Sequence, residues 1–310
     1  MSARNGEPQF GSRTSAYEVV AGRDLSGKTM VVTGANTGIG DPTARALASA
    51  GARVVYACRQ KASGEAAVAR AVAAHPGCAA EFAELDLASF ASIRRFAERL
   101  SAERIDALIC NAGLFLMKWA ETEEGFERTL GVCHIGHFLL TRWLIPRLLA
   151  SQAPRIVMVS SVAHESPAKL DFDALPVTKG NFQGMAAYGQ AKLCNVLMAK
   201  ELQSRYGDRG LTACALHPGT LVRTDIGRHS KLAGALIRLV SPFTKTPLQG
   251  AATSVYAAVH EPATDLAGQY LKDCRIATCS AEANDRAVAR RLWTASDEWI
   301  ARAGAPEWPQ

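Results

Sequence analysis

The sequence lacks the features that would tie it to a membrane or to nucleic acid. No uninterrupted apolar run is long enough to span a bilayer, because the most apolar stretch, His137 to Ala150, contains Arg142, Pro146 and Arg147. The formal charge of +6 is modest and the basic residues are dispersed, so no Lys/Arg tract offers a surface for nucleic acid. The first 25 residues are polar, without the apolar core of a signal peptide. We therefore expect a soluble cytoplasmic protein with no transmembrane segment and no nucleic-acid partner.

The eight cysteines also lack the patterns of a metal or disulfide framework. No CxxC pair occurs, and no Cys/His spacing matches a zinc site. Several cysteines lie inside predicted strands or helices, where cysteine usually acts as a small hydrophobe. We expect reduced thiols and no bound metal.

What the chain does contain is a regular alternation of apolar, β-branched runs with longer segments of helical spacing. No Pro/Gly/Ser-rich linker divides its 310 residues, so we expect an N-terminal extension (1–26) and a single domain (27–310). Short, nearly all-apolar strands alternating with helices are typical of a parallel sheet covered on both faces. The prediction is an α/β fold with a doubly wound, seven-stranded parallel sheet and helices on both faces. The expected strands are Thr29–Thr33, Arg53–Ala57, Ala80–Leu85, Ala107–Cys110, Arg155–Ser160, Leu211–Leu216 and Gly268–Leu271, with helical segments such as Pro42–Ala50, Phe90–Leu100 and Gly125–Leu149.

A glycine-rich turn follows the first expected strand. Gly34, Gly38 and Gly40 lead into a helix with the spacing GxxxGxG rather than GxGxxG. Glycine lets a diphosphate approach the backbone, and the helix N-terminus supplies amides and a positive dipole. A purely structural turn explains the pattern about as well, but its place between the first strand and the first helix favours a dinucleotide site. The negative charge of Asp41, the next residue, is unexplained at such a site.

Two further strand ends bear on the cofactor. The second strand is followed by Arg59, with Lys61 nearby and without the acid that usually binds the ribose of NAD. We therefore expect NADP(H) in preference to NAD(H); the alternative is that Arg59 is an ordinary surface residue. Asp86, after the third strand, either meets adenine or backbone donors or caps the helix that begins near Ser89.

Tyr188 and Lys192 stand four residues apart in a predicted helix, so they share one face. The positive charge of the lysine favours the phenolate form of the tyrosine, which makes the phenol a usable acid or base. Most such pairs are solvated helix surface, but Tyr188 is the only one of six tyrosines with this spacing to a lysine. A proton-transfer pair on the same chain as a dinucleotide turn indicates an oxidoreductase.

In this order along the chain, the motifs resemble those of the short-chain dehydrogenase/reductase family, from Gly27 onward. Within that family the chain looks most similar to the group of retinol dehydrogenases and WW-domain-containing oxidoreductases, through segments such as Gly136–Thr141, Lys192–Asn195 and Gly250–Thr253. The motifs that carry the family resemblance are Thr33–Gly40, Asp86, Cys110-Asn111-Ala112-Gly113, Val159-Ser160-Ser161-Val162, Tyr188-x-x-x-Lys192 and His217-Pro218-Gly219-Thr220.

The resemblance implies a Rossmann fold and an NAD(P)-dependent alcohol dehydrogenase or carbonyl reductase. It assigns Tyr188 as the general acid/base. It implies that Lys192 favours the phenolate form of Tyr188 and binds the nicotinamide ribose, and that Ser161 hydrogen-bonds the reacting oxygen. The implied cofactor-binding residues are Gly34, Asn36, Thr37, Gly38, Ile39, Gly40, Arg59, Asp86, Leu87, Asn111, Ala112, Gly113, Tyr188, Lys192, Pro218, Gly219 and Thr220.

Two departures from the family stand out. Its fourth catalytic residue is an asparagine that holds a water for proton relay, and Cys133 occupies that position here. A thiol is a poorer donor and acceptor, so we expect a slower relay or one rerouted through His134. The spacing of 27 positions between Ser161 and Tyr188 is longer than usual, as in the retinol-dehydrogenase branch. The extra segment, His164 to Gln183, either covers the pocket or forms a surface loop.

The residues after the Pro-Gly turn bear on the substrate. The resemblance implies a substrate lid at about 220–247, and apolar residues recur at helical spacing in Ile226–Val240. A greasy lid favours a lipophilic alcohol or ketone, such as a 17β-hydroxysteroid or a retinoid, although such a stripe equally suits packing on a core. The remaining alternatives are a protochlorophyllide-type ring reductase and a nucleotide-binding scaffold without turnover. The resemblance also implies a homodimer or homotetramer through Gly125–Leu149 and Ala187–Tyr206.

Overall fold

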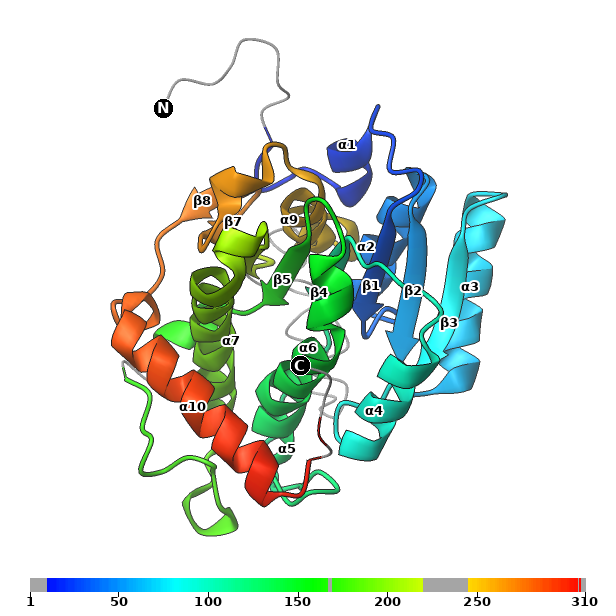
Figure 1. The fold of residues 1–310 in the computed structure, drawn as a ribbon. Coiled ribbons are helices and arrows are strands. Elements are labelled where there is room, and N and C mark those ends of the chain that lie inside the picture. Colours follow the sequence, from blue (N-terminus) through cyan, green and yellow to red (C-terminus); the bar gives the residue numbers. More distant parts are fainter. Residues whose placement is uncertain (1–9, 167–168, 220–244, 306, 308–310) are drawn as a thin grey trace, which may run out of the picture.

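The computed structural model describes residues 10–166, 169–219, 245–305 and 307. A single twisted sheet runs through the centre in the order β3-β2-β1-β4-β5-β6-β7-β8 (Figure 1). The parallel α/β architecture and all the expected strands are confirmed, with small shifts at their ends. The strands are β1 (Thr29–Thr33), β2 (Arg53–Cys58), β3 (Ala80–Glu84), β4 (Ala107–Cys110), β5 (Arg155–Val159), β6 (Thr212–His217), β7 (Tyr270–Lys272) and β8 (Arg275–Ala277).

The sheet has eight strands rather than the predicted seven, and the extra one is antiparallel. β8 pairs with β7 through a two-residue turn at Asp273 and Cys274, which both adopt positive φ, 54° and 59°. Positive φ at both central residues is the geometry of a tight hairpin turn, which usually contains glycine or asparagine. The turn went unrecognised because cysteine is unusual in this conformation and each strand is only three residues long.

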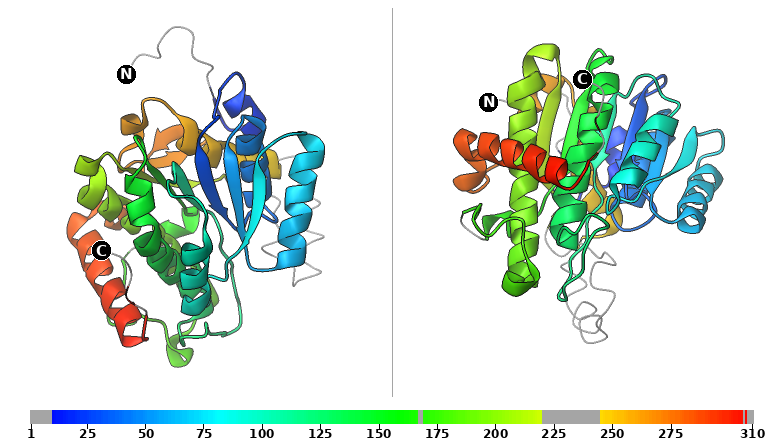
Figure 2. Two further views of the ribbon diagram at one scale, coloured as in Figure 1. Left: turned by 45° about the vertical axis from the view of Figure 1, so that its right-hand side comes forward. Right: turned by 60° about the horizontal axis from the view of Figure 1, so that its bottom comes forward.

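Helices cover both faces of the sheet, and each face has its own apolar core (Figures 1 and 2). The strands alternate between them: Val31 and Val55 face one core, whereas Val32 and Val54 face the other. This double burial explains why the strands are almost entirely apolar. One core packs against α1 (Ala16–Val20), α2 (Gly40–Ser49), α3 (Lys61–Ala74) and α9 (Pro247–Val259), and the other against α4 (Phe90–Arg99), α6 (Gly136–Leu149), α7 (Gly184–Tyr206) and α10 (Arg286–Arg302).

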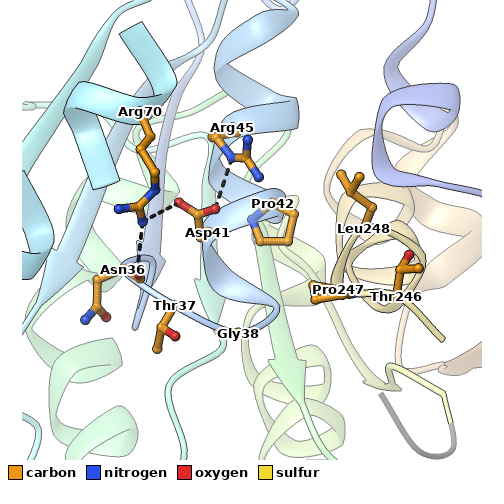
Figure 3. Close-up of a pocket in the computed structure, with 10 residues that line it drawn as sticks. All are labelled: Asn36, Thr37, Gly38, Asp41, Pro42, Arg45, Arg70, Thr246, Pro247 and Leu248. Atoms are coloured by element: carbon orange, nitrogen blue, oxygen red, sulfur yellow. Dashed lines mark hydrogen bonds and ion pairs between the residues drawn. The ribbon is translucent and has the colours of Figure 1, made fainter. Parts of the chain in front are cut away.

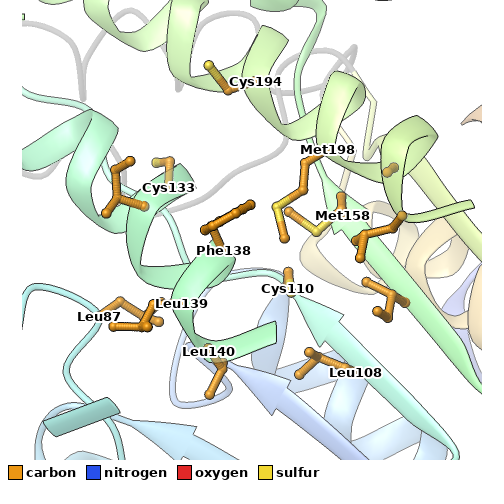
Figure 4. Packing of buried hydrophobic residues seen from close by; sticks show 14 of the residues in the cluster. Leu87, Leu108, Cys110, Cys133, Phe138, Leu139, Leu140, Met158, Cys194 and Met198 are labelled. Atoms are coloured by element: carbon orange, nitrogen blue, oxygen red, sulfur yellow. The ribbon is translucent and has the colours of Figure 1, made fainter. Parts of the chain in front are cut away.

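The core beneath α6 and α7 is rich in sulfur-containing side chains. Figure 4 shows Phe138 from α6 beside Met158 on β5, Met198 on α7 and Cys110 on β4. All eight cysteines are free thiols and six of them are buried. Burial raises the pKa of the Cys110 thiol to about 12, so this cysteine is a packing residue rather than a nucleophile.

The C-terminal helix α10 lies across α6 and α7, as Figure 1 shows. Trp293 of α10 packs edge-on against Phe138 with ring centroids 4.8 Å apart, and the Arg205 guanidinium of α7 lies 4.5 Å from the Trp293 ring centroid. The two helices expected to form subunit contacts are therefore partly covered by the chain's own C-terminus.

The N-terminal part of the chain joins the fold before residue 27. α1 is buried at Ala16, Val19 and Val20, and Arg23 donates to the carbonyl of Val259 at 2.8 Å. Within the described ranges, no helix is long and apolar enough to cross a membrane.

Candidate active site

A cleft of about 790 Å³ opens at the carboxyl ends of the central strands. It brings together residues that the sequence analysis drew from six separate motifs. Of the expected site residues, Gly40, Ser161 and Gly219 do not line it, and Thr220 lies outside the described residues. Those that line it are Gly34, Asn36, Thr37, Gly38, Ile39, Arg59, Asp86, Leu87, Asn111, Ala112, Gly113, Tyr188, Lys192 and Pro218.

The glycine turn, residues 34–40, forms one wall of this cleft. Gly34 and Gly38 both adopt positive φ, 65° and 60°, which a residue with a side chain rarely does. Gly40 has a different role, because a Cβ there would lie 2.3 Å from the Gly34 carbonyl oxygen and 2.6 Å from Asn111 Nδ2. Its missing side chain lets the first turn of α2 pack directly beneath the glycine turn. Asn111 fixes the same turn by donating from Nδ2 to the Thr33 carbonyl at 2.8 Å.

A buried histidine that the sequence analysis overlooked links this turn to the Cys133 segment. His137 Nδ1 lies 3.1 Å from the Cys133 carbonyl and its Nε2 lies 2.9 Å from Thr33 Oγ1. The carbonyl can only accept, so Nδ1 carries the proton and Nε2 accepts from the threonine hydroxyl. Thr33 Oγ1 in turn accepts the backbone N–H groups of Asn111 and Ala112, both at 2.9 Å. Burial lowers the pKa of His137 to about 4, which agrees with a neutral ring.

Asp41 is held by two arginines on the outer side of the glycine turn. Its carboxylate lies 3.0 Å from Arg45 Nε and 3.2 Å from Arg70 Nη2, and Arg70 also donates to the Asn36 carbonyl at 3.2 Å (Figure 3). The acid is thus neutralised and, through Arg70, supports the turn. These residues border a second cavity of about 360 Å³, closed on its other side by Thr246, Pro247 and Leu248 at the start of α9.

The ends of β2 and β3 present opposite charges to the cleft. Arg59 is exposed, and no carboxylate in the described part of the chain forms an ion pair with it, whereas Lys61 pairs with Glu65 at 3.8 Å. Asp86 accepts the Ala88 N–H at 2.9 Å in a turn before α4, while Ser89 itself caps that helix. Asp86 is therefore not the helix cap, and it also lines the cleft.

Tyr188 and Lys192 project from α7 and line the cleft together with the glycine turn. Lys192 Nζ lies 5.6 Å from the centroid of the Tyr188 ring and donates to the Val159 carbonyl at 3.0 Å. Asn195 donates to the same carbonyl at 3.2 Å, and Ser160 Oγ donates to the Lys192 carbonyl at 2.7 Å. The end of β5 thus fixes α7 by three hydrogen bonds and directs the lysine toward the cleft.

Cys133 occupies a π-helical segment, Gly131–Ile135, that precedes α6. Cys133 Sγ and Lys192 Nζ both lie beside Gly113, since a Cβ at that glycine would be 3.4 Å and 3.2 Å from them. The thiol and the ammonium group therefore both lie against this glycine. His134 does not, because its Nε2 is 2.8 Å from Ser296 Oγ of α10. A proton relay through His134 is therefore not supported, and His137 is the histidine bonded to this segment.

Ser161 begins the serine turn, residues 161–166, directly after β5. Its Oγ accepts the Ala163 N–H at 3.2 Å, which leaves the hydroxyl proton available to another acceptor. The turn packs closely on α7, because a Cβ at Gly189 would lie 1.8 Å from the Ser166 carbonyl oxygen. The segment that follows is not a simple surface loop, since Leu170, Leu175 and Val177 are buried in the core.

Apolar side chains gather near Tyr188, and among them Phe115 lines the cleft. Phe115 packs edge-on against Tyr188 with ring centroids 5.4 Å apart, and Trp119 packs against Phe182 at 5.6 Å. Met117 and Met185 are 68% and 62% exposed, the two most exposed large hydrophobic side chains of the described residues. Phe115, Met117 and Trp119 were not among the predicted site residues, although they cluster in Leu114–Trp119 directly after the Asn111–Gly113 motif. Phe115, Met117, Trp119, Phe182 and Met185 are together called the apolar rim below.

Comparisons with known proteins agree with this geometry. A sequence model described as short chain dehydrogenase matches residues 28–172. The chain is 45% identical over 278 residues to human retinol dehydrogenase 12, covering 89% of this chain and 87% of that protein. It is 40% identical over 300 residues to human WW domain-containing oxidoreductase, covering 94% of this chain and 72% of that protein.

Two solved structures extend the comparison to three dimensions. An uncharacterized protein from Mycobacterium paratuberculosis superposes with a TM-score of 0.75 and 33% identity, over 94% of this chain and 98% of that one. A protein from Beutenbergia cavernae, described as a candidate NAD(P)-dependent gluconate 5-dehydrogenase with bound NADP, superposes with a TM-score of 0.63 and 29% identity over 80% of this chain and 95% of that one.

Proposed function

The chain belongs to the short-chain dehydrogenase/reductase family of NAD(P)-dependent oxidoreductases, and we propose that it interconverts a lipophilic secondary or retinoid-type alcohol and its carbonyl compound with NADP(H). The observation that carries the proposal is the meeting of Tyr188, Lys192 and the glycine turn around one cleft. A proton-transfer group and a dinucleotide turn that share a cavity can act on one substrate molecule.

The residues of the cleft fit a dinucleotide. Side chains are absent at Gly34, where a Cβ would touch Ala112 at 3.0 Å, and at Gly113, where it would approach Lys192 Nζ. The backbone of the glycine turn and the start of α2 offer amides to a diphosphate. Arg59, for which the described residues provide no ion-pair partner, supplies a guanidinium at the far end, beyond β2. The bound nicotinamide would accept or donate the hydride.

In the proposed reaction this chain's own residues move and hold the proton. Tyr188 takes the hydroxyl proton of the alcohol in the oxidative direction and returns it to the carbonyl oxygen in the reductive one. Ser161, which follows the cleft-lining Ser160, donates its O–H to the same oxygen. Lys192, anchored to the Val159 carbonyl, keeps further N–H donors for the nicotinamide ribose and places its positive charge near the Tyr188 phenol.

The substrate class follows from the apolar rim and not from the expected lid, whose residues 220–244 lie outside the described ones. Phe115 also lines the cleft, so an apolar surface continues from the mouth to Tyr188. Burying apolar area contributes roughly 25 cal/mol per Å², which favours a steroid or retinoid over a short alcohol. A hydroxysteroid, such as a 17β-hydroxysteroid, and retinol are therefore the first substrates to test.

The decisive experiment replaces Tyr188 with phenylalanine. Tyr188→Phe removes only the hydroxyl, so we expect kcat to fall by about 10²–10⁴ while the Kd for NADPH changes little. Turnover is measured with a panel of steroids, retinoids and simple secondary alcohols, and binding by NADPH fluorescence. Retained turnover in the variant contradicts the proposal, and so does an inactive wild type across the panel.

The cofactor preference is tested in the same binding assay. Arg59→Ala should weaken NADPH by roughly 10- to 100-fold, because a charged hydrogen bond to the ribose phosphate is lost, and should leave NADH binding almost unchanged. If the wild type binds NADH more tightly than NADPH, the NADP(H) preference is refuted, but the proposed alcohol/carbonyl reaction is not.

The expected subunit interface, formed by the two long helices alone, has to be extended to include α10. Because α10 covers part of α6 and α7, we propose that a homodimer or homotetramer uses α10 together with the uncovered parts of these helices. Light scattering of the purified chain measures the subunit number directly.

A further inference from the structure

A second buried histidine lies directly behind Ser161. His164 is fully buried in the serine turn, and both its backbone N–H, at 3.1 Å, and its Nδ1, at 2.7 Å, point to the Ser161 carbonyl oxygen. Its other nitrogen, Nε2, lies 3.2 Å from the backbone nitrogen of Ser280, which is 116 positions further along the chain. None of the reaction steps described above uses this side chain.

The two partners determine the state of the imidazole. A carbonyl oxygen only accepts, so Nδ1 carries the proton, and a backbone N–H only donates, so Nε2 offers its lone pair. The ring is therefore neutral, with each nitrogen in one defined role. Tyr270 packs against it with ring centroids 4.9 Å apart, and the tyrosine hydroxyl lies 3.5 Å from Nδ1, at the limit of a hydrogen bond.

The carbonyl that His164 holds belongs to the peptide that carries Ser161. Ser161 is extended, with φ −155° and ψ 161°, and rotation about ψ would turn its carbonyl away from the ring and change the course of the turn. Holding this oxygen from two donors fixes the peptide plane and with it the turn that presents the Ser161 hydroxyl. The link to Ser280 ties that turn to the segment between β8 and α10.

We propose that His164 is a positioning residue that holds Ser161 in its reactive orientation and couples it to the Ser280 segment. The proposal rests on the proposed function, in which Ser161 donates to the reacting oxygen. In this role His164 needs a hydrogen-bond donor at Nδ1 to hold the Ser161 carbonyl and an acceptor at Nε2 to hold the Ser280 N–H.

Two amide variants separate these contacts. In His164→Asn the amide nitrogen overlies Nδ1 and keeps the donor to Ser161 while losing Ser280. In His164→Gln the amide oxygen overlies Nε2 and keeps Ser280 while losing the donor to Ser161. We expect the glutamine variant to lower kcat by on the order of 10- to 100-fold, since a small misplacement of a reacting group is costly, with the Kd for NADPH within about twofold. The asparagine variant should keep kcat within about threefold and lose more thermal stability.

The controls separate a positioning role from general damage. Tyr270→Phe removes the neighbouring hydroxyl without touching either bond of His164, and it should leave kcat within about twofold. Melting temperatures and NADPH binding of all three variants report folding. An equal loss of kcat in both amide variants, or a loss that follows the melting temperature, overturns the proposal.

Failure of the His164 role and failure of the proposed function give different results. If the wild type is active and Tyr188→Phe is not, but His164→Gln retains full kcat, only the role of His164 is wrong. If the wild type turns over none of the panel substrates, the proposed function fails and the positioning role falls with it.

Discussion

The glycine turn lines the cleft, whereas the serine turn follows directly after the cleft-lining Ser160, and the two turns are held in different ways. The path of the glycine turn is set by positive φ at its own Gly34 and Gly38, and Asn111 and Arg70 add hydrogen bonds to carbonyls at and beside it. The serine turn depends on residues far apart in sequence, with Ser280 behind it and Gly189 against it. A local motif can therefore define a binding surface, whereas an oriented catalytic hydroxyl needs support from the tertiary fold.

The largest effect should come from closing the space between the serine turn and α7. In Gly189→Ala the new methyl would lie 1.8 Å from the Ser166 carbonyl oxygen and 2.9 Å from that of Ala163, both backbone atoms that cannot move alone. The turn or the helix must shift, next to Tyr188, so we expect kcat to fall by more than about 100-fold. Steady-state kinetics with saturating NADPH measure this.

The same substitution at Gly180 is its control. An added Cβ there meets only Thr178 Oγ1, at 4.0 Å, so Gly180→Ala should behave as the wild type. If Gly189→Ala keeps its kcat, the serine turn is not held against α7 in the way described.

Gly40→Ala should disturb the glycine turn rather than the serine turn. Its methyl would lie 2.3 Å from the Gly34 carbonyl oxygen, and overpacking of this kind costs about 1–3 kcal/mol. Because the displaced atoms belong to the glycine turn, we expect the Kd for NADPH to rise about 10- to 100-fold, with a smaller change in kcat at saturating cofactor. Binding titrations and kinetics on one preparation measure both quantities, and a fall in kcat without weaker binding would show that the two turns are not separate in function.

Acid should destabilise the folded chain through buried histidines. Burial lowers the pKa of His137 to about 4 and that of His217 also to about 4, below the ordinary value of 6.5. The unfolded chain thus binds more protons between about pH 6.5 and pH 4, so the free energy of unfolding is largest above pH 6.5 and falls as the pH is lowered. We expect the melting temperature to drop by about 2 °C or more per histidine for each pH unit in this window.

A matched substitution tests the origin of that slope. His137→Gln removes one titrating group, so its melting temperature should depend less steeply on pH than that of the wild type, although it starts lower. Parallel slopes for the two proteins would assign the acid sensitivity to other groups.

The sequence predicted those residues of the cleft that belong to short local motifs. The glycine turn, Asn111 and the Tyr188–Lys192 pair all line one cavity, because strand ends of a parallel sheet converge. It missed what depends on tertiary partners. The charge of Asp41 made sense only once Arg70, on the next helix, was seen to reach it, and His137 only once Thr33 lay beside it. The β7–β8 hairpin was missed because its turn contains no glycine.

The smallest effect is expected at Cys133, where the chain departs from its family. Within the described part of the chain its thiol makes one long hydrogen bond, 3.7 Å to the Leu114 carbonyl, whereas its backbone carbonyl accepts from His137 whatever the side chain. Cys133→Asn therefore leaves that backbone contact in place and adds an amide beside Lys192, a better partner for water than a thiol. We expect kcat to be unchanged or raised by a few-fold, with Cys194→Ser, a thiol buried in the same core, as the control for disturbing a buried cysteine. A large loss of kcat at unchanged melting temperature would mean that the thiol itself takes part in the reaction, and the family's proton relay would then have been replaced rather than weakened.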